Sequence, residues 1–148
     1  MGVLSDIIIA DRTEATSINA AEGNHLKQWD CLESKGIDTI KLGSLSRILA
    51  GRSLDDVPAV PVFMDNSLLD KYSDDGPWVY LVPDQLVSAL AALDDDAEET
   101  VAASWAEIEE FRLSRWQPMD VQEYLHDLIE YARKARDQGK SLLLWMSV

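Results

Sequence analysis

The apolar positions in the second half of the chain predict an almost continuous series of elements, in the order strand, helix, helix, helix, strand. Trp78 to Val82 (WVYLV) is a short apolar run after an Asp-Gly turn, which is typical of a buried strand. Pro83 suits the first position of a helix that continues through DQLVSALAAL. The final run, SLLLWMSV, is too apolar for a strand exposed on both faces. It could lie centrally in the sheet or pair across a dimer, and the sequence allows both.

Two longer amphipathic patterns lie between these strands. The first follows the acidic run Asp94 to Asp96, which suits a helix start, and its apolar positions recur at helical spacing. These positions are Ala97, Val101, Trp105 and Ile108. The second is predicted to begin with Asp120 as N-cap and Glu123 at the capping-box position, and to end at Gly139. Its apolar face consists of Val121, Leu125, Leu128, Ala132 and Ala135.

The first half begins with a predicted strand at Val3 to Ile9, in which Asp6 is the conspicuous polar residue. Asp11 and Glu14 have capping-box spacing and open a helix that ends near Gly23 and Asn24. The next ten or so residues, from 25 to 35, show no clear period, although their aromatic and leucine residues are expected to anchor them to the core.

A short amphipathic helix is predicted after Asp38, which suits an N-cap, and Gly51 marks its end. Arg52 to Gly76 then forms a long irregular connection. It contains one predicted strand, Val60 to Met64. This strand is expected at an edge of the sheet, because Pro58 and Pro61 each lack the backbone N–H that a central strand donates.

These elements predict an α+β fold in a single domain spanning residues 1–148. A chain of 148 residues is long enough to bury roughly 70% of the surface that its unfolded form exposes. We expect a small mixed sheet, containing at least Val3 to Ile9, Trp78 to Val82 and Leu142 to Met146, covered by four to five α-helices.

Several segments carry a family resemblance in their order along the chain. They are GIDTIKLGSLSRILAG, YLVPDQLVSALAAL, the acidic helix start, RWQP and LHDLIEYARKARDQGKSLLLW. Together they resemble the YfbM-like family of small uncharacterised bacterial proteins, which runs a strand through a proline into a helix and closes with a long helix, a glycine and a strand. The resemblance implies a single α+β domain and supplies neither an activity nor catalytic residues.

The charge is strongly acidic, with a net value of −14 that divides into about −4 for residues 1–72 and −10 for residues 73–148. Binding to nucleic acid depends on neutralising phosphates with Lys and Arg, so this chain would repel the backbone. Nucleic acids and anionic membranes are therefore disfavoured as partners, and a basic protein or a cation is favoured. Acidity that simply keeps a bacterial-type protein soluble explains the same composition.

Cys31 is the only cysteine, so no intramolecular disulfide can form, and the chain begins without a signal-peptide pattern. A cytoplasmic location follows as the default. A thiol nucleophile would need Cys31 beside His25 or His126, and nothing near Cys31 favours a lowered pKa. A half-buried structural cysteine is expected instead, with His126 as a boundary residue bonded to a carboxylate. We expect no metal site and no cofactor, because the few ligand-type residues are widely separated.

An acidic cluster between residues 94 and 110 is the candidate surface for a basic partner, and it contains no basic residue. Helix capping and a solvated helix face explain most of it, and it lacks the spacing of a calcium loop. The cluster consists of Asp94, Asp95, Asp96, Glu98, Glu99, Glu107, Glu109 and Glu110.

Aromatic residues supply the candidates for ligand binding. Asp74 and Asp75 precede Trp78, an arrangement that a sugar or cation site could use, although a turn before a core tryptophan explains the same residues. Trp116 lies in a connection between helices, flanked by Arg115 and Gln117. It is the tryptophan that we expect to meet a ligand or another chain.

Three functions remain open from the sequence. The first is a non-enzymatic binding protein that recognises a basic protein through its acidic second half, as immunity or adaptor proteins do. The second is a small-molecule binder whose pocket near Trp78 is closed by the connection from Arg52 to Gly76. The third, an enzyme, would have to rely on carboxylates, of which Asp6 is the first to consider. The sequence favours the binding protein, and it leaves the oligomeric state open.

Overall fold

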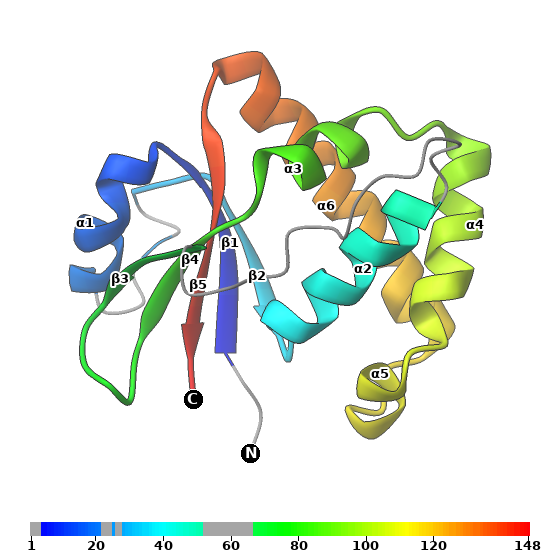
Figure 1. Ribbon diagram of the computed structural model, residues 1–148, viewed down its shortest axis with the longest axis horizontal. Helices are drawn as coiled ribbons and strands as arrows, with labels where there is room; N and C mark the ends of the chain where they lie inside the picture. The colour runs from blue at the N-terminus through cyan, green and yellow to red at the C-terminus, as the bar shows by residue number, and fades with distance from the viewer. Residues whose placement is uncertain (1–3, 22–24, 26–27, 52–66) are drawn as a thin grey trace.

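A computed structural model describes residues 4–21, 25, 28–51 and 67–148 of the chain, and within them it has one five-stranded sheet with helices on both faces (Figure 1). The strand order is β2-β1-β5-β4-β3, and every described pairing is antiparallel. The strands are β1 (Leu4–Ala10), β2 (Cys31–Lys35), β3 (Leu68–Lys71), β4 (Trp78–Leu81) and β5 (Ser141–Ser147).

The apolar strand β5 lies at the centre of the sheet, between β1 and β4. Successive residues point to opposite faces of a strand, so an uninterrupted apolar run requires a core on both sides. Leu142 and Leu144 lie in the core beneath the larger helical layer, whereas Leu143 and Trp145 lie in a second core on the opposite face. The sequence left a central or a dimer-pairing position open for this strand, and the structure has the central one.

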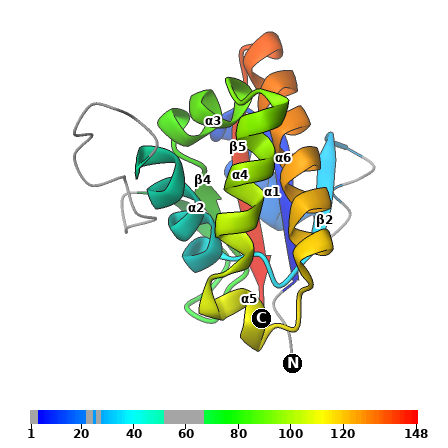
Figure 2. The same ribbon diagram turned by 90° about the vertical axis from the view of Figure 1, so that its right-hand side faces the viewer.

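Most of the helices pack on one face of the sheet, and Figure 2 looks onto this layer. The opposite face is covered by the 3₁₀ helix η1 (Arg12–Glu14) and α1 (Ala15–Ala20). The helices of the larger layer are α2 (Thr39–Gly51), α3 (Asp84–Ala91), α4 (Asp95–Ala106), α5 (Glu109–Leu113) and α6 (Pro118–Gln138). Trp105 is fully buried in this layer, where its Nε1 donates to the backbone oxygen of Lys41 at 2.9 Å.

The long helix α6 begins three residues before its predicted start. Gln117 is the N-cap, Pro118 occupies the first turn, and Asp120 is the N3 residue that accepts from the Gln117 backbone N–H at 2.9 Å. The prediction of Asp120 as N-cap is therefore wrong. The N-cap is Gln117, three residues earlier, and Asp120 is its partner in the capping box. The predicted stop is confirmed, since Gly139 ends the helix with a left-handed φ of 66°.

Two strands were missed by the sequence pattern, and both are edge strands. β2 lies where no period was evident, and β3 lies within the connection predicted from Arg52 to Gly76. Their sequences, CLESK and LLDK, are short and largely polar, so neither shows the apolar run of a central strand. The predicted edge strand at Val60 to Met64 lies outside the described residues.

The α+β fold class is confirmed, with two refinements. The sheet is antiparallel at every described pairing rather than mixed. The described residues contain six α-helices rather than four to five, because the five-residue helix α5 is too short to produce an amphipathic period.

Candidate functional site

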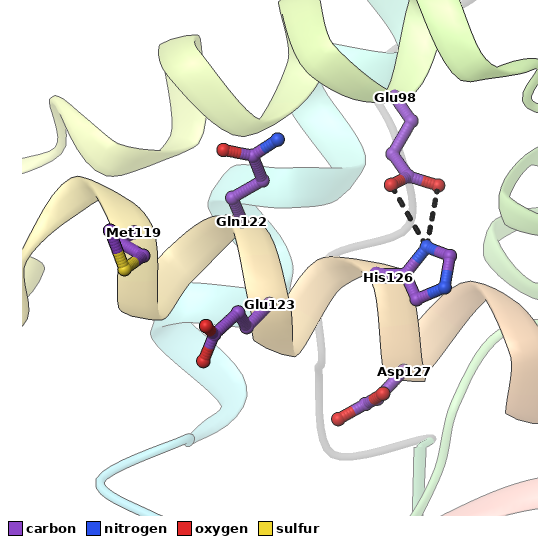
Figure 3. A pocket seen from close by; sticks show the side chains of 6 residues that line it. All are labelled: Glu98, Met119, Gln122, Glu123, His126 and Asp127. Atoms are coloured by element: carbon purple, nitrogen blue, oxygen red, sulfur yellow. Dashed lines mark hydrogen bonds and ion pairs between the residues drawn. The ribbon is translucent and has the colours of Figure 1, made fainter.

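A hollow of about 540 Å³ lies along the exposed sides of α4 and α6 (Figure 3). We call it the acidic groove, and its lining consists of Glu98, Met119, Gln122, Glu123, His126 and Asp127. Figure 3 shows Glu98 pointing from α4 towards His126, while Glu123 and Asp127 lie on the other side of α6. The groove therefore presents three carboxylates, one imidazole and one thioether.

The spacing of polar residues along α6 produces this groove. Met119, Glu123 and His126 recur at three- and four-residue intervals, so they share the exposed side of the helix. The alternate positions Leu125 and Leu128 are buried against the core. The sequence does carry this pattern, but it does not show which helix lies beside α6. Glu98 was identified beforehand as a candidate partner-binding residue, and His126 was expected at the helix boundary, bonded to a carboxylate.

His126 is the cation of the acidic groove. Its Nδ1 lies 3.1 Å from Glu98 Oε2, and its Nε2 lies 3.4 Å from Glu130 Oε1. The hydrogen bond and the negative charge of Glu98 raise the pKa of His126 above its ordinary value. The imidazolium form therefore persists to higher pH, and the groove becomes more negative when His126 loses its proton.

The eight predicted acidic residues fall into two groups rather than one surface. Asp94 is the N-cap of α4 and accepts from the Ala97 N–H at 2.8 Å, and Asp95, Asp96 and Glu98 occupy the first turn, followed by Glu99. The remaining three lie at the other end of α4 and the start of α5. Eight residues of helical rise separate Glu99 from Glu107, so the two groups lie about 12 Å apart along the helix. The first group is Asp94, Asp95, Asp96, Glu98 and Glu99, and the second is Glu107, Glu109 and Glu110.

Trp78, Asp74 and Asp75 line neither the acidic groove nor the second hollow, which lies beside Trp116. The Trp78 ring covers Gly76 so closely that a Cβ added there would lie 2.7 Å from the ring. Asp74 is highly exposed and accepts from Lys71 Nζ at 2.8 Å, and this bond lowers the pKa of Asp74. Asp75 donates its backbone N–H to Ser73 Oγ at 3.2 Å. These contacts belong to the turn between β3 and β4.

Trp116 borders a second hollow, of about 820 Å³, at the junction of α5 and α6. We call it the turn pocket, and its lining includes Glu107, Arg112, Arg115, Trp116, Gln117 and Pro118. The Trp116 ring packs against Phe111 at 5.0 Å between centroids and edge-on against Tyr124 at 5.7 Å. The aromatic residue suspected from the sequence is thus half-buried, packed against the core and bordering the turn pocket.

The end of α5 fixes the shape of the turn pocket. Arg115 has a φ of 63°, and it is the only non-glycine residue with positive φ in the described part of the chain. The Trp116 N–H donates to Phe111 O at 3.0 Å and the Arg115 N–H to Arg112 O at 3.2 Å, which is the Schellman arrangement of a helix end. Arginine therefore occupies a position that normally favours glycine.

We expect Arg115→Gly to raise the free energy of unfolding by about 1 kcal/mol. A side chain in the left-handed region costs roughly 1–2 kcal/mol, part of which is offset by the greater freedom of glycine in the unfolded chain. Urea unfolding of both proteins measures the difference. Arg112→Gly is the matched control, because it places glycine in helical backbone and should cost about 1 kcal/mol. Loss of stability in Arg115→Gly would show that the arginine side chain contributes more than its backbone strain costs.

A buried lysine stabilises this turn through hydrogen bonds. Lys41 is 3% exposed, and its Nζ donates to the Gly36 backbone oxygen and, at 2.9 Å, to Ser114 Oγ. The ammonium also lies 5.4 Å from the centroid of the Phe111 ring. Burial lowers the pKa of Lys41, against the opposing influence of Asp38 and Glu110. Lys41 thus holds the last turn of α5 in place.

The opposite face of the sheet contains Asp6, the carboxylate first considered for an enzyme. His25 is fully buried, and its Nδ1 lies 2.6 Å from Asp6 Oδ2. Its Nε2 lies 3.0 Å from the Ile18 backbone oxygen, which can only accept, so this nitrogen carries a proton. Both ring nitrogens are therefore engaged, and Asp6 serves as the partner of a buried histidine.

The Cys31 thiol lies in the same region and is 6% exposed. Burial and then the nearby Asp6 carboxylate raise its pKa to about 12. The thiol is therefore protonated at neutral pH, and the His25 nitrogens are bonded elsewhere. This arrangement suits a structural cysteine rather than a nucleophile, which requires the thiolate.

No group of three or more His, Cys, Asp or Glu side chains among the described residues is arranged to hold a metal ion. No helix in the described part of the chain is both long and apolar enough to span a membrane.

Comparison with known proteins supports the fold and identifies no function. No protein-family model matches the chain, and no curated protein matches it. Among solved structures, it is similar to YfbM from Escherichia coli, a protein of unknown function, with a TM-score of 0.51 and 15% sequence identity. The match covers 97% of this chain and 99% of that one. The resemblance to YfbM noted in the sequence therefore extends to the arrangement of almost the whole chain.

Proposed function

We propose that this chain is a non-enzymatic binding protein whose acidic groove receives a basic segment of a partner protein. The observation that carries the proposal is that Glu98, Glu123 and Asp127 all line one hollow beside α4 and α6. A net charge of −14 adds a long-range field that attracts positively charged proteins. The proposal places the protein in the cytoplasm, in an immunity- or adaptor-like role.

The chemistry of the groove fits a lysine or arginine side chain of the partner. The carboxylates supply charge-assisted hydrogen bonds, and Met119, which is 68% exposed, supplies an adaptable apolar contact for the aliphatic stem. His126 competes with the partner for Glu98, since it lies 3.1 Å from that carboxylate. Binding should therefore strengthen as pH rises through the raised pKa of His126, because the groove then loses its own cation.

The test is capture of partners by tagged protein from the lysate of its own host, at about 50 mM and about 500 mM salt. We expect a basic protein to be captured at low salt and lost at high salt. The variant Glu98→Gln/Glu123→Gln/Asp127→Asn should weaken its binding roughly tenfold, because exposed ion pairs contribute up to about 1 kcal/mol each. Calorimetry with the identified partner gives the affinity of each protein.

A second variant controls for the general loss of charge. Asp84→Asn/Asp137→Asn/Glu33→Gln removes the same number of exposed carboxylates from elsewhere on the molecule. It should keep the affinity within about twofold, since these sites lie outside the groove and exposed charges are largely screened. Equal weakening by both variants would mean that net charge rather than the groove attracts the partner. Capture that persists at high salt would contradict the electrostatic proposal itself.

A further inference from the structure

The turn pocket has an unexpected charge for so acidic a chain. Arg112 and Arg115 both line it, and neither forms an ion pair with any residue that the structure describes. Glu107 is the one carboxylate among the lining residues. From Arg112 to Met119 the sequence contains no acidic residue. Two guanidinium groups without an ion-pair partner in the described part of the chain therefore line one hollow.

Further positive potential comes from beneath the pocket. The buried Lys41 ammonium donates to Ser114 Oγ at 2.9 Å, so it lies directly under the turn that carries Arg115. It has no carboxylate within ion-pair distance among the described residues. Gln117 and Pro118, which begin the 21-residue helix α6, place the positive end of that helix at the same pocket, where the Asp120 carboxylate accepts from the Gln117 N–H.

Trp116 supplies a flat apolar surface beside these cations. Its ring also borders a neighbouring hollow, so both hollows share this indole. The lining of that neighbouring hollow includes Lys35 and Arg115 together with the carboxylates Asp120, Glu123 and Asp127. Its Nε1 makes no hydrogen bond to any described residue, in contrast to Trp105, whose Nε1 is bonded to a backbone oxygen. The indole ring thus lies beside the two guanidinium groups that line the turn pocket.

We propose that the turn pocket binds a small organic anion that contains a planar ring. The ring stacks on Trp116, and a carboxylate or phosphate group accepts from Arg112 and Arg115. Arginine forms paired hydrogen bonds to both kinds of anion, and its planar head suits them better than lysine does. A volume of about 820 Å³ falls within the range of small-molecule sites. This site is separate from the acidic groove and takes a ligand of the opposite charge.

The test follows the indole N–H signals of ¹⁵N-tryptophan-labelled protein during titration with two ring anions. Indole-3-acetate carries the carboxylate and adenosine 5′-monophosphate the phosphate, and comparison of the two identifies the preferred anion. We expect one of them to move the Trp116 signal, which Trp116→Phe identifies, with a dissociation constant of about 1 mM or less. Adenosine alone and inorganic phosphate should move it little, because each supplies only one half of the ligand.

Two arginine variants make the proposal falsifiable. Arg115→Gly removes one guanidinium from a backbone position that favours glycine, so the variant should fold and bind at least tenfold more weakly. Arg136→Gln is the control, because Arg136 is exposed in α6 with only Asp137 as its partner, and it should bind as the unmodified protein does. Unchanged binding in Arg115→Gly would overturn the proposal. So would an unmoved Trp116 signal with both anions, or an equal shift with adenosine alone.

Discussion

His25→Ala should lower the free energy of unfolding by about 3 to 5 kcal/mol, as measured by urea unfolding near neutral pH. The imidazole is fully buried, with Nδ1 against Asp6 and Nε2 against the Ile18 carbonyl. Removing one member of a buried hydrogen-bonded pair leaves the other polar groups without partners, and this is the most expensive kind of side-chain loss. A cavity beside Trp145, whose ring lies 4.7 Å from the imidazole, adds to the cost.

A matched substitution separates this effect from a general cost of losing histidine. His126→Ala removes the same side chain from an exposed site, and it should change stability by no more than about 0.5 kcal/mol because exposed ion pairs contribute little. A double-mutant cycle of His25→Ala with Asp6→Asn should give a coupling of about 1 to 3 kcal/mol. Coupling near zero would show that the two side chains do not depend on each other, despite their 2.6 Å separation.

Alkaline pH should destabilise the protein through Cys31. The folded state raises the pKa of this thiol from 9.0 to about 12, chiefly by burial and then by the charge and hydrogen bond of Asp6. Between these values the unfolded chain has lost the thiol proton and the folded chain has kept it, so a rise in pH favours unfolding. The stability that the thiol contributes is complete below pH 9.0, and it declines as pH approaches the folded pKa. One pKa unit corresponds to about 1.4 kcal/mol, so the loss should reach roughly that value at pH 10.

Comparison with Cys31→Ala isolates the thiol from other groups that titrate in this range. Burial raises the pKa of Tyr124 and Tyr131, which adds to alkaline destabilisation, and burial lowers the pKa of Lys41, which opposes it. The variant retains all three groups. The stability difference between the two reduced proteins, measured by urea unfolding, should therefore shrink by about 1.4 kcal/mol from pH 8 to pH 10. A constant difference over this range would mean that the folded thiol ionises as freely as the unfolded one.

The apolar pattern was sufficient to predict the central strands and most of the helices. β1, β4 and β5, together with α2, α3, α4 and α6, were all expected close to their observed positions, because each buries a continuous run or a helical stripe. The edge strands β2 and β3 and the short helix α5 were missed. An edge strand buries little and a five-residue helix completes barely more than one turn, so neither produces a recognisable period.

The candidate sites were only partly predictable, because each depends on contacts between distant segments. Glu98 and Trp116 were identified from composition and position, but the rest of the acidic groove depends on α4 packing beside α6. The pairing of Asp6 with His25 had one sequence signal, a carboxylate inside an apolar strand. The partner could not be identified, since it lies 19 positions away in a segment without a clear period.

The central position of β5 determines the order in which the sheet can be completed during synthesis. β5 is the last of the five strands along the chain, yet it alone joins β1 to β4. Until β5 has emerged from the ribosome, β1 and β2 on one side and β4 and β3 on the other each retain an unpaired inner edge, and such edges invite pairing with other chains. Contacts between the first and last strands also close the longest loop in the molecule, which slows folding. The nascent chain therefore carries two open strand edges from the completion of β4 until β5 is available, and one late event closes both.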